Sequence, residues 1–297
     1  MKPEIAVLDI QSQYRVYTEF YRAEAAEATI VLVNGSLATT ASFAQTVRNL
    51  HPLMNVVAYD PPYAGKSKPH NAHALPLTKE LEGQILLELI EHFGADHLLS
   101  FSWGGAAALV ALAHRPRRIK KAVISSFSPV INPALQDYLT QGQQHCKEMN
   151  RFGVGNLVNG TLGKYLPPLF KRFNHRHVSS LAAHEYAQMH HAIEHILDVR
   201  NHPQIKAARR INIPVMFING ERDEYTTAPE AQLFSNHIRD CHFSTIENAG
   251  HFLDMESSSA CHDTQRVLLN FLMPEQNANR AVHPPMYRPQ AYAAQAR

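Results

Sequence analysis

Three residues whose types suit acyl transfer follow predicted strands at separate points of the chain. Ser102 comes after the apolar run HLLSF and before the helix-forming stretch GGAAALVALA, Asp223 comes shortly after VMFING, and His251 comes after HFSTIENAG. A serine hydroxyl is a weak nucleophile at neutral pH, so it needs an imidazole to accept its proton and a carboxylate to orient that imidazole. These residues therefore predict a nucleophile, a general base and a carboxylate that orients the base.

The segment SFSWGG, which starts at Ser100, has the pattern of a nucleophile elbow. Such an elbow is a sharp strand-to-helix turn that needs small residues two positions before and after the nucleophile. Ser100 stands where the usual pattern has Gly. A serine at this junction can also be a simple helix cap, so the motif alone leaves both interpretations open. The chain order Ser, Asp, His, with each residue after a predicted strand, favours the α/β-hydrolase arrangement. Three other acids could replace Asp223 beside the histidine: Glu221, Glu224 and Asp254.

The oxyanion of an acyl-transfer intermediate needs hydrogen-bond donors that are already in place. The backbone N–H of Trp103, directly after the predicted nucleophile, is expected to be one donor. An N–H near Ser36, in the segment VNGS that starts at Val33, is expected to be the other. Asn34 in the same segment is expected to contact the substrate.

The elements that must position these residues follow from hydrophobic periodicity. Residues 5–10 and 14–22 predict a hairpin, and TIVLVNGS and MNVVAYD predict buried strands. LTKELEGQILLELIEHFG predicts an amphipathic helix that ends at Gly94. Strands that alternate with helices in this way predict an α/β fold, with a mostly parallel twisted sheet flanked by helices. We assign the two parts of this core to residues 1–131 and 211–272.

Two further regions differ from the core in amino-acid composition and in hydrophobic pattern. Residues 132–210 lack strand signals and are rich in His, Asn, Tyr, Leu and Met, which predicts an inserted helical cap. Residues 273–297 are rich in Pro, Gln and Ala and show no apolar period, which predicts a disordered tail.

Composition narrows the function classes. The chain has 297 residues, of which 45% are hydrophobic and 18% charged, as expected for a soluble globular protein. A net charge of +2 gives no field that favours nucleic acid. No apolar run approaches the roughly twenty residues that span a bilayer, so we expect no stable membrane association. The acidic, weakly apolar N-terminus does not resemble a secretory signal, and three scattered cysteines suit a reducing compartment. We therefore expect a cytoplasmic protein.

The predicted cap contains histidines and basic residues that could bind ligands. Its histidines lack the carboxylate or cysteine pattern of a metal site, so we expect hydrogen-bonded or solvated imidazoles and no metal: His175, His177, His184, His190, His191 and His195. Residues 165–170 and Met189 either line an acyl tunnel or pack the cap. Lys171 and Arg172, with Arg176 nearby, are expected to meet an acidic carrier protein or CoA phosphates. The basic run 115–121 predicts an ordinary solvated surface.

Five segments resemble the (R)-3-hydroxyacyl-acyl carrier protein:CoA transacylases of medium-chain polyhydroxyalkanoate synthesis in pseudomonads: VNGSLATTASFAQTVRNL, SFSWGGAAALVALAH, NLVNGTLGKYLPPLFKRFNHRHVSSL, INGERDEYTT and AGHFLDMES. The resemblance runs from residue 1 to 272 and extends to the sister synthases of the rhamnolipid 3-hydroxyacyloxy-acid moiety. It implies an α/β-hydrolase fold and a catalytic triad that falls on Ser102, Asp223 and His251. It also implies acyl carrier protein as the donor of a 3-hydroxydecanoyl-sized chain, with CoA as acceptor substrate and no other cofactor.

The chain departs from this family at one motif, a histidine followed five residues later by Asp. The motif would begin at His177, for which the resemblance implies a substrate contact, but position 182 is Ala. Either the motif is not essential or transfer activity has been lost. We favour the first interpretation, because the predicted triad already supplies a complete acyl-transfer mechanism.

The residues leave the acyl acceptor open. Transfer to CoA, release to water by a thioesterase, and transfer to the hydroxyl of a second 3-hydroxy acid share the same acyl-enzyme step. The resemblance makes CoA the preferred acceptor. A binding protein without turnover and a generic carboxylesterase are alternatives from other classes.

Overall fold

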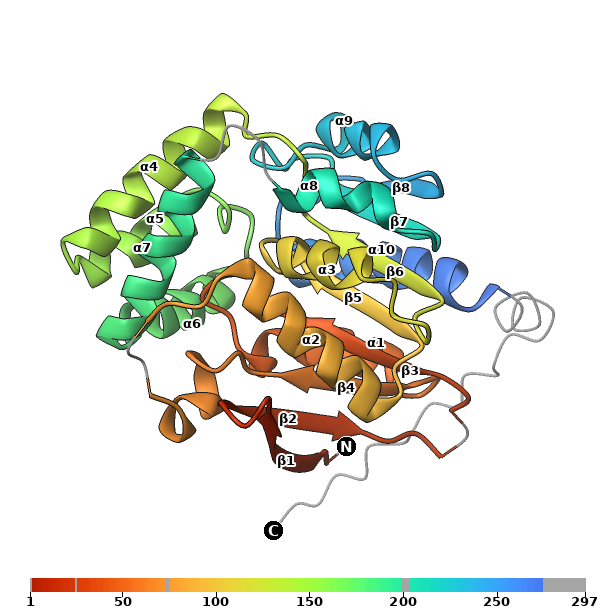
Figure 1. The fold of residues 1–297 in the computed structure, drawn as a ribbon. Helices are drawn as coiled ribbons and strands as arrows, with labels where there is room; N and C mark the ends of the chain where they lie inside the picture. The colour runs from red at the N-terminus through yellow and green to blue at the C-terminus, as the bar shows by residue number, and fades with distance from the viewer. Residues whose placement is uncertain (1, 25, 73–74, 199–202, 275–297) are drawn as a thin grey trace, which may run out of the picture.

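The computed structural model describes residues 2–24, 26–72, 75–198 and 203–274. These residues form one eight-stranded sheet in the order β1-β2-β4-β3-β5-β6-β7-β8 (Figure 1). The strands are β1 (Glu4–Ile10), β2 (Tyr14–Tyr21), β3 (Thr29–Val33), β4 (Asn55–Tyr59), β5 (His97–Phe101), β6 (Lys121–Ser125), β7 (Val215–Gly220) and β8 (Cys241–Ile246). The predicted α/β architecture is therefore confirmed.

The direction of the strands explains where the candidate residues lie. β1 and β2 form the predicted antiparallel hairpin, and β2 is also antiparallel to β4. From β4 to β8 all neighbouring strands are parallel. The carboxyl ends of parallel strands meet at one edge, which is where ligands bind in open α/β sheets. Ser36, Ser102, Asp223 and His251 all follow strands of this parallel part, so their loops share that edge.

Helices cover both faces of the sheet (Figure 1). On one face, α1 (Ala44–Leu50) and α10 (Ser258–Leu272) bury residues such as Leu50 and Leu268 against strand residues such as Leu99. On the other face, the buried residues of α2 (Lys79–Phe93), α3 (Gly104–Ala113), α8 (Pro203–Ala207) and α9 (Ala228–Ala231) share a second core. Short 3-10 helices lie at Thr40–Phe43, Gly65–His70, Ala208–Arg210, Gln232–Asn236 and Leu253–Met255.

Helix α2 shows how local residues determine where a helix begins and ends. Thr78 precedes its first residue and accepts a hydrogen bond from the N–H of Leu81 at 3.3 Å, which satisfies one free donor of the first turn. Ile85, Leu86, Leu89 and Ile90 are buried at helical spacing. Gly94 then ends the helix in the left-handed conformation with φ 59°, as the sequence predicts.

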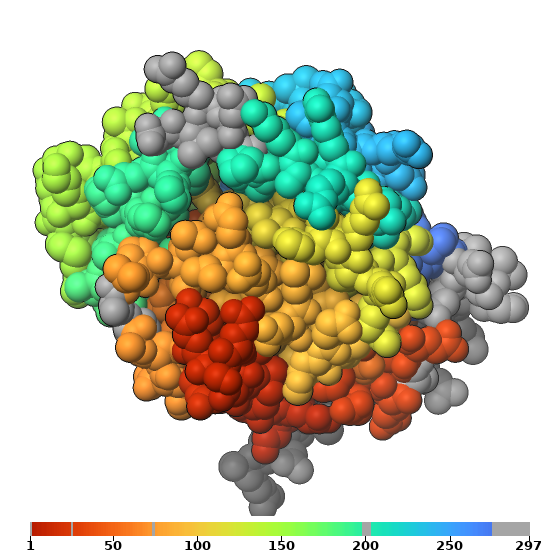
Figure 2. All heavy atoms as spheres, viewed as in Figure 1, coloured from red at the N-terminus to blue at the C-terminus, as the bar shows by residue number. Residues whose placement is uncertain are grey.

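The region between β6 and β7 is helical throughout its described residues. It contains α4 (Pro133–Lys147), α5 (Arg151–Gly160), α6 (Pro168–Ser179) and α7 (Ala183–Asp198), which share a buried core that includes Leu139 and Tyr186. These four helices form a cap at one end of the sheet (Figure 1), and its atoms lie directly against those of the α2 region (Figure 2). The following α8 contacts α3 of the core instead. The boundaries 132 and 210 stay a prediction, and the predicted tail lies, from residue 275, outside the described residues.

Two further features concern the length of the helices and the pairing of the cysteines. Within the ranges that the structure describes, no helix has both the length and the apolar composition needed to cross a bilayer. Cys146, Cys241 and Cys261 are all free thiols.

Candidate active site

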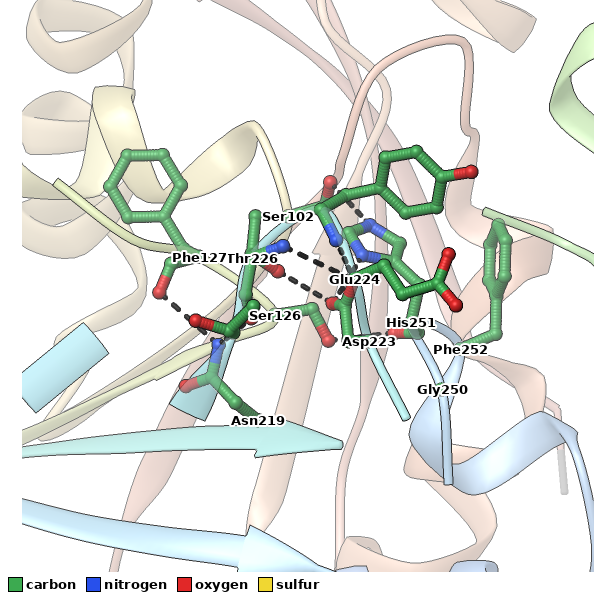
Figure 3. A network of polar contacts seen from close by, with 12 residues as sticks. Ser102, Ser126, Phe127, Asn219, Asp223, Glu224, Thr226, Gly250, His251 and Phe252 are labelled. Atoms are coloured by element: carbon green, nitrogen blue, oxygen red, sulfur yellow. Dashed lines mark hydrogen bonds and ion pairs between the residues drawn. The ribbon is translucent and has the colours of Figure 1, made fainter. Parts of the chain in front are cut away.

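The imidazole of His251 lies between Ser102 and Asp223 (Figure 3). Its Nε2 is 2.9 Å from Ser102 Oγ, and its Nδ1 is 2.8 Å from Asp223 Oδ2. A carboxylate can only accept, so Nδ1 carries the proton and Nε2 accepts from the serine hydroxyl. His251 and Asp223 are buried, while Ser102 is half-buried and lines a cavity. The fold therefore brings the three predicted residues into one chain of hydrogen bonds.

The turn at Ser102 has the strain of a nucleophile elbow. Ser102 has φ 51°, in the left-handed region that non-glycine residues rarely adopt. Its N–H donates to Ser125 O at 2.8 Å, which fixes the turn on strand β6. A Cβ at Gly104 would come within 2.4 Å of Asn34 O, so only glycine lets the start of α3 approach the end of β3 this closely. Ser100, in place of the usual first Gly, is fully buried, and its Oγ has no hydrogen-bond partner among the described residues.

Four contacts hold Asp223 as a carboxylate and oppose the effect of its burial. Its Oδ1 accepts from the backbone N–H of Tyr225 and of Thr226, and its Oδ2 accepts from the Thr226 hydroxyl at 2.6 Å as well as from His251 (Figure 3). Burial by itself raises the pKa of Asp223, but the charge and hydrogen bond of His251 and the bonds from Thr226 and Tyr225 lower that pKa below its ordinary value. The group therefore stays ionised at neutral pH, as an orienting carboxylate must.

The three alternative acids face other partners. Glu221 accepts from the N–H of Asn248 at 2.8 Å, and Glu224 forms an ion pair with Lys164. Asp254 lines the cavity, accepts from the Thr46 hydroxyl at 2.8 Å, and has its pKa raised by burial. Within the described residues, the carboxylate in contact with His251 is that of Asp223.

Two backbone amides next to Ser102 are free to bind an oxyanion. The N–H groups of Ser36 and Trp103 have no hydrogen-bond partner among the described residues. Both residues line the cavity, and a Cβ added at neighbouring Gly35 would lie 3.3 Å from Ser102 Cβ, so this loop touches the serine. Amides left unpaired by the protein must bind water or a ligand, and both of these amides belong to residues on the cavity wall. Their place beside the serine suits an oxyanion hole, as the sequence predicts.

The cap reaches the same loop through His177. His177 Nε2 lies 2.7 Å from Leu37 O, and because a carbonyl only accepts, Nε2 must carry the proton. Leu37 has φ 60°, a conformation that its side chain disfavours. The hydrogen bond from His177 therefore helps to hold a strained residue one position after Ser36. His177 also lines the cavity, so the expected substrate contact remains open to it.

We expect His177→Ala to lower kcat by about 100-fold with little change in KM, because a displaced loop misplaces one oxyanion donor. His177→Gln, whose amide can still donate to Leu37 O, should recover part of the loss. The measurement is steady-state kinetics of acyl transfer or of a chromogenic ester. His175→Ala is the matched control, since His175 lies on the same helix but contacts Asn156 instead. A change confined to KM would show that His177 acts only in substrate binding.

Three residues that the sequence predicts as substrate contacts do not line the cavity. Asn34 is buried behind the loop, where its amide donates to Tyr59 O at 2.8 Å and accepts from Ser42, so it braces the loop and does not line the cavity. Lys171 Nζ donates to Lys164 O at 2.7 Å within the cap. Arg172 is exposed on α6 outside the cavity. Sequence position alone could not distinguish these residues from their cavity-lining neighbours.

Sequence reasoning also missed residues that support the histidine. Glu256 accepts from the N–H of Gly250 at 2.6 Å and of Phe252 at 2.9 Å, on either side of His251. The Ser126 hydroxyl donates to His251 O at 2.6 Å (Figure 3). A buried glutamate five residues after a predicted catalytic histidine is a signal that could have pointed to this bracing role.

The cavity beside Ser102 has a volume of about 730 Å³ and extends under the cap. Its cap side is mostly apolar and includes Leu166, Phe170 and Met189 from the predicted tunnel, together with Val158 and Ile196. Cavities of this size and lining bind small apolar ligands with a few polar groups. No group of three or more His, Cys, Asp or Glu in the described ranges could hold a metal ion, although His191 and His195 line the cavity.

Comparisons with known proteins agree with this geometry. A family model described as alpha/beta hydrolase fold matches residues 28–258. A Pseudomonas putida protein named (R)-3-hydroxydecanoyl-ACP:CoA transacylase is 63% identical over 98% of this chain and 98% of its own. A Pseudomonas aeruginosa protein of the same name is 54% identical over 99% of this chain and 97% of its own.

Solved structures of low sequence identity share the fold of this chain. The enol-lactonase from Burkholderia xenovorans LB400 matches with a TM-score of 0.74 at 16% identity, covering 90% of this chain and 99% of that chain. A deep-sea metagenome enzyme, MGS-M2, matches with a TM-score of 0.73 at 21% identity, covering 90% and 96%. The chain belongs to the α/β-hydrolase family and, within it, to the group formed by these transacylases.

Proposed function

We propose that this protein transfers (R)-3-hydroxyacyl chains of about 3-hydroxydecanoyl size from acyl carrier protein to CoA through an acyl-serine intermediate. The observation that carries the proposal is the Ser102–His251–Asp223 chain of hydrogen bonds, which opens on an apolar cavity under the cap. Similarity to the named transacylases over nearly the whole chain supports the choice of donor and acceptor.

In the first half-reaction, Ser102 Oγ attacks the carbonyl carbon of the carrier-bound thioester while His251 Nε2 accepts its proton. The N–H groups of Ser36 and Trp103 would hold the oxyanion that forms. Collapse of the tetrahedral intermediate breaks the carbon–sulfur bond, and His251 returns the proton to the departing thiolate. The products are an ester on Ser102 and the free thiol of the carrier protein.

In the second half-reaction, the CoA thiol takes the place that the carrier thiol leaves. His251 Nε2 accepts the thiol proton as the sulfur attacks the ester carbonyl, and the same two amides hold the second oxyanion. Collapse breaks the ester bond, the proton passes to Ser102 Oγ, and the acyl-CoA leaves. No redox step occurs, so CoA acts as a substrate and no cofactor is part of the proposal.

Water is the competing acceptor, which makes a thioesterase the second candidate function. The mostly apolar cap side of the cavity supports transfer, because an alkyl chain packed on it would limit the access of water to the acyl ester. Transfer to a second 3-hydroxy acid uses the same acyl-enzyme. We include a cytoplasmic location in the proposal, since free thiols, carrier protein and CoA suit that compartment. Supply of CoA thioesters for polyhydroxyalkanoate synthesis is the corresponding metabolic role.

The decisive experiment incubates the purified protein with 3-hydroxydecanoyl-acyl carrier protein, with and without CoA. Mass spectrometry of the products then names the acceptor. We expect 3-hydroxydecanoyl-CoA when CoA is present and little free acid within the same time. Free 3-hydroxydecanoic acid as the main product under both conditions would establish a thioesterase instead, and a dimeric ester would establish a synthase.

Ala182 fits this proposal because position 182 has a local structural role. Ala182 directly precedes α7, and its N–H donates to Glu185 Oε2 at 2.8 Å, which is one half of a capping box. An Asp at this position would offer a second acceptor to the N–H of Glu185, which already donates to Ala182 O at 3.0 Å. A carboxylate at position 182 would thus serve in helix capping, a role that the triad does not need.

We therefore expect Ala182→Asp to raise the free energy of unfolding by about 1 kcal/mol. The transfer rate should stay within about twofold of wild type, a difference of less than 1 kcal/mol in barrier height. Urea denaturation and the transfer assay measure the two quantities. A gain in kcat of tenfold or more, about 1.4 kcal/mol, would instead mean that the motif carboxylate takes part in the reaction.

A further inference from the structure

One face of α6 exposes apolar and basic side chains together. Leu169 is 52% exposed and Phe173 51% exposed, and Arg172 and Arg176 are exposed beside them. These four residues have the spacing i, i+3, i+4 and i+7, so they follow one another along one side of the helix. We call them the α6 stripe. The helix contains no acidic residue.

The two arginines of the stripe are free to bind a partner. Neither Arg172 nor Arg176 has a hydrogen bond or an ion pair with the described residues, in contrast to Lys171, whose amine is bound to Lys164 O. Exposed Leu and Phe side chains beside unpaired cations differ from an ordinary solvated helix face, which is polar. The mixture is typical of a surface that meets an acidic protein with apolar contacts of its own.

The adjacent side of α6 lines the cavity and leads to the active site. Phe170, Phe173, Asn174 and His177 all border the cavity, and His177 contacts the loop that bears Ser36. From Phe170 to His177 the helix rises by about 10 Å, at 1.5 Å per residue. Phe173 belongs both to the stripe and to the cavity wall. The stripe is therefore continuous with the interior in which Ser102 reacts.

We propose that the α6 stripe is the docking surface for acyl carrier protein. The proposal rests on the proposed function, because it assigns a place to the donor of that reaction. A carrier protein is acidic and delivers its thioester on a long, flexible pantetheine arm. The arginines would bind its carboxylates, Leu169 and Phe173 would pack against its apolar side chains, and the arm would enter along α6. The phosphates of CoA call for cations alone, so the exposed apolar side chains of Leu169 and Phe173 beside the arginines favour the protein as occupant.

The test compares two donors that carry the same acyl chain. One is 3-hydroxydecanoyl-acyl carrier protein and the other is 3-hydroxydecanoyl-pantetheine, which lacks the protein. We expect the double variant Arg172→Glu/Arg176→Glu to lower kcat/KM for the carrier-bound donor at least about tenfold, because like charges then face each other across the interface. Activity on the pantetheine thioester should stay within about twofold. Leu169→Ser should act in the same direction, since Leu169 is exposed and does not line the cavity.

Two further measurements test whether the effect comes from charge at the α6 stripe. One varies the ionic strength and the other uses a control variant with the same change of charge. Salt should weaken the wild-type preference for the carrier-bound donor and partly restore the activity of the double variant on that donor, because it screens the attraction in the first case and the repulsion in the second. Arg117→Glu/Arg239→Glu makes the same change of charge at two exposed residues that precede β6 and β8, at the opposite edge of the sheet. This control should retain the wild-type kcat/KM for both donors.

Direct binding separates this proposal from the proposed function. The dissociation constant for carrier protein bearing unacylated pantetheine, measured by fluorescence anisotropy, should rise at least about tenfold in the double variant. An unchanged constant, or equal losses on both donors, would overturn the docking surface even if transfer to CoA is found. Weakened binding without any transfer by the wild type would support the surface and remove the proposed reaction.

Discussion

Ser102→Ala is expected to lower the rate of acyl transfer at least about 10⁴-fold, because it removes the atom that forms the acyl-enzyme. Ser102 is half-buried and would lose only its hydroxyl oxygen, so the fold and the two oxyanion amides should persist. Intact-protein mass spectrometry should show an acyl adduct on the wild type and none on the variant. A fluorophosphonate probe should label the wild type alone. An acyl adduct on the variant would identify another nucleophile.

Ser100→Ala is the matched control for this experiment. It makes the same substitution two residues earlier in β5, at a serine whose hydroxyl has no partner among the described residues. Removing a buried hydroxyl that makes no hydrogen bond relieves a desolvation cost, so the melting temperature should stay the same or rise. Transfer should stay within about twofold of wild type. The pair of variants then separates loss of the nucleophile from any disturbance of the elbow.

Much of the fold could be predicted because strand and helix periodicities are local signals. The buried run HLLSF, the hairpin signals before Tyr21 and the Gly94 helix end each depend on a few neighbouring residues. The site could be predicted for a related reason. Each candidate residue follows a strand of the parallel sheet, and the carboxyl ends of such strands meet at one edge. Local patterns therefore fixed a non-local meeting of three side chains.

The remaining contacts depend on which element lies opposite, and a local pattern does not carry that information. Asn34 precedes the oxyanion loop in sequence, yet its amide turns inward to Tyr59 O. Lys171 and Arg172 are neighbours in sequence, but helical geometry points them about 100° apart, so one binds within the cap and the other is exposed. The bond from His177 to Leu37 joins residues 140 positions apart.

The choice among the acids was open for the same reason. Asp223, Glu221 and Glu224 all lie in one turn after β7, and the sequence favours Asp223 without excluding the other two. β8 is parallel to β7 and pairs with it, so the loop that bears His251 lies directly beside this turn. Within the turn, Tyr225 and Thr226 donate to Asp223, which points its second oxygen to the imidazole. The backbone of the turn therefore selects the acid.

Asp223→Asn tests that selection, and we expect it to lower kcat by about 10⁴-fold. The two backbone N–H groups that donate to Oδ1 should hold the amide oxygen of the variant in that position. The NH₂ group then faces His251 Nδ1, which must accept. The imidazole proton must then sit on Nε2, which faces Ser102. A protonated Nε2 cannot accept the serine proton. Glu224→Gln, at an exposed acid paired with Lys164, should leave kcat unchanged.

Asp223→Asn should also lower the free energy of unfolding by an amount that depends on pH. The folded-state pKa of Asp223 is lowered by His251 and Thr226, which outweigh its burial. A lowered carboxyl pKa contributes stability that is present above the unfolded value of about 3.9 and is lost as the pH falls through the folded value. Thermal unfolding should thus find the wild type more stable than Asp223→Asn at pH 7, with a difference that narrows below about pH 4. A difference that stays constant on acidification, with kcat within tenfold of wild type, would mean that another group orients His251.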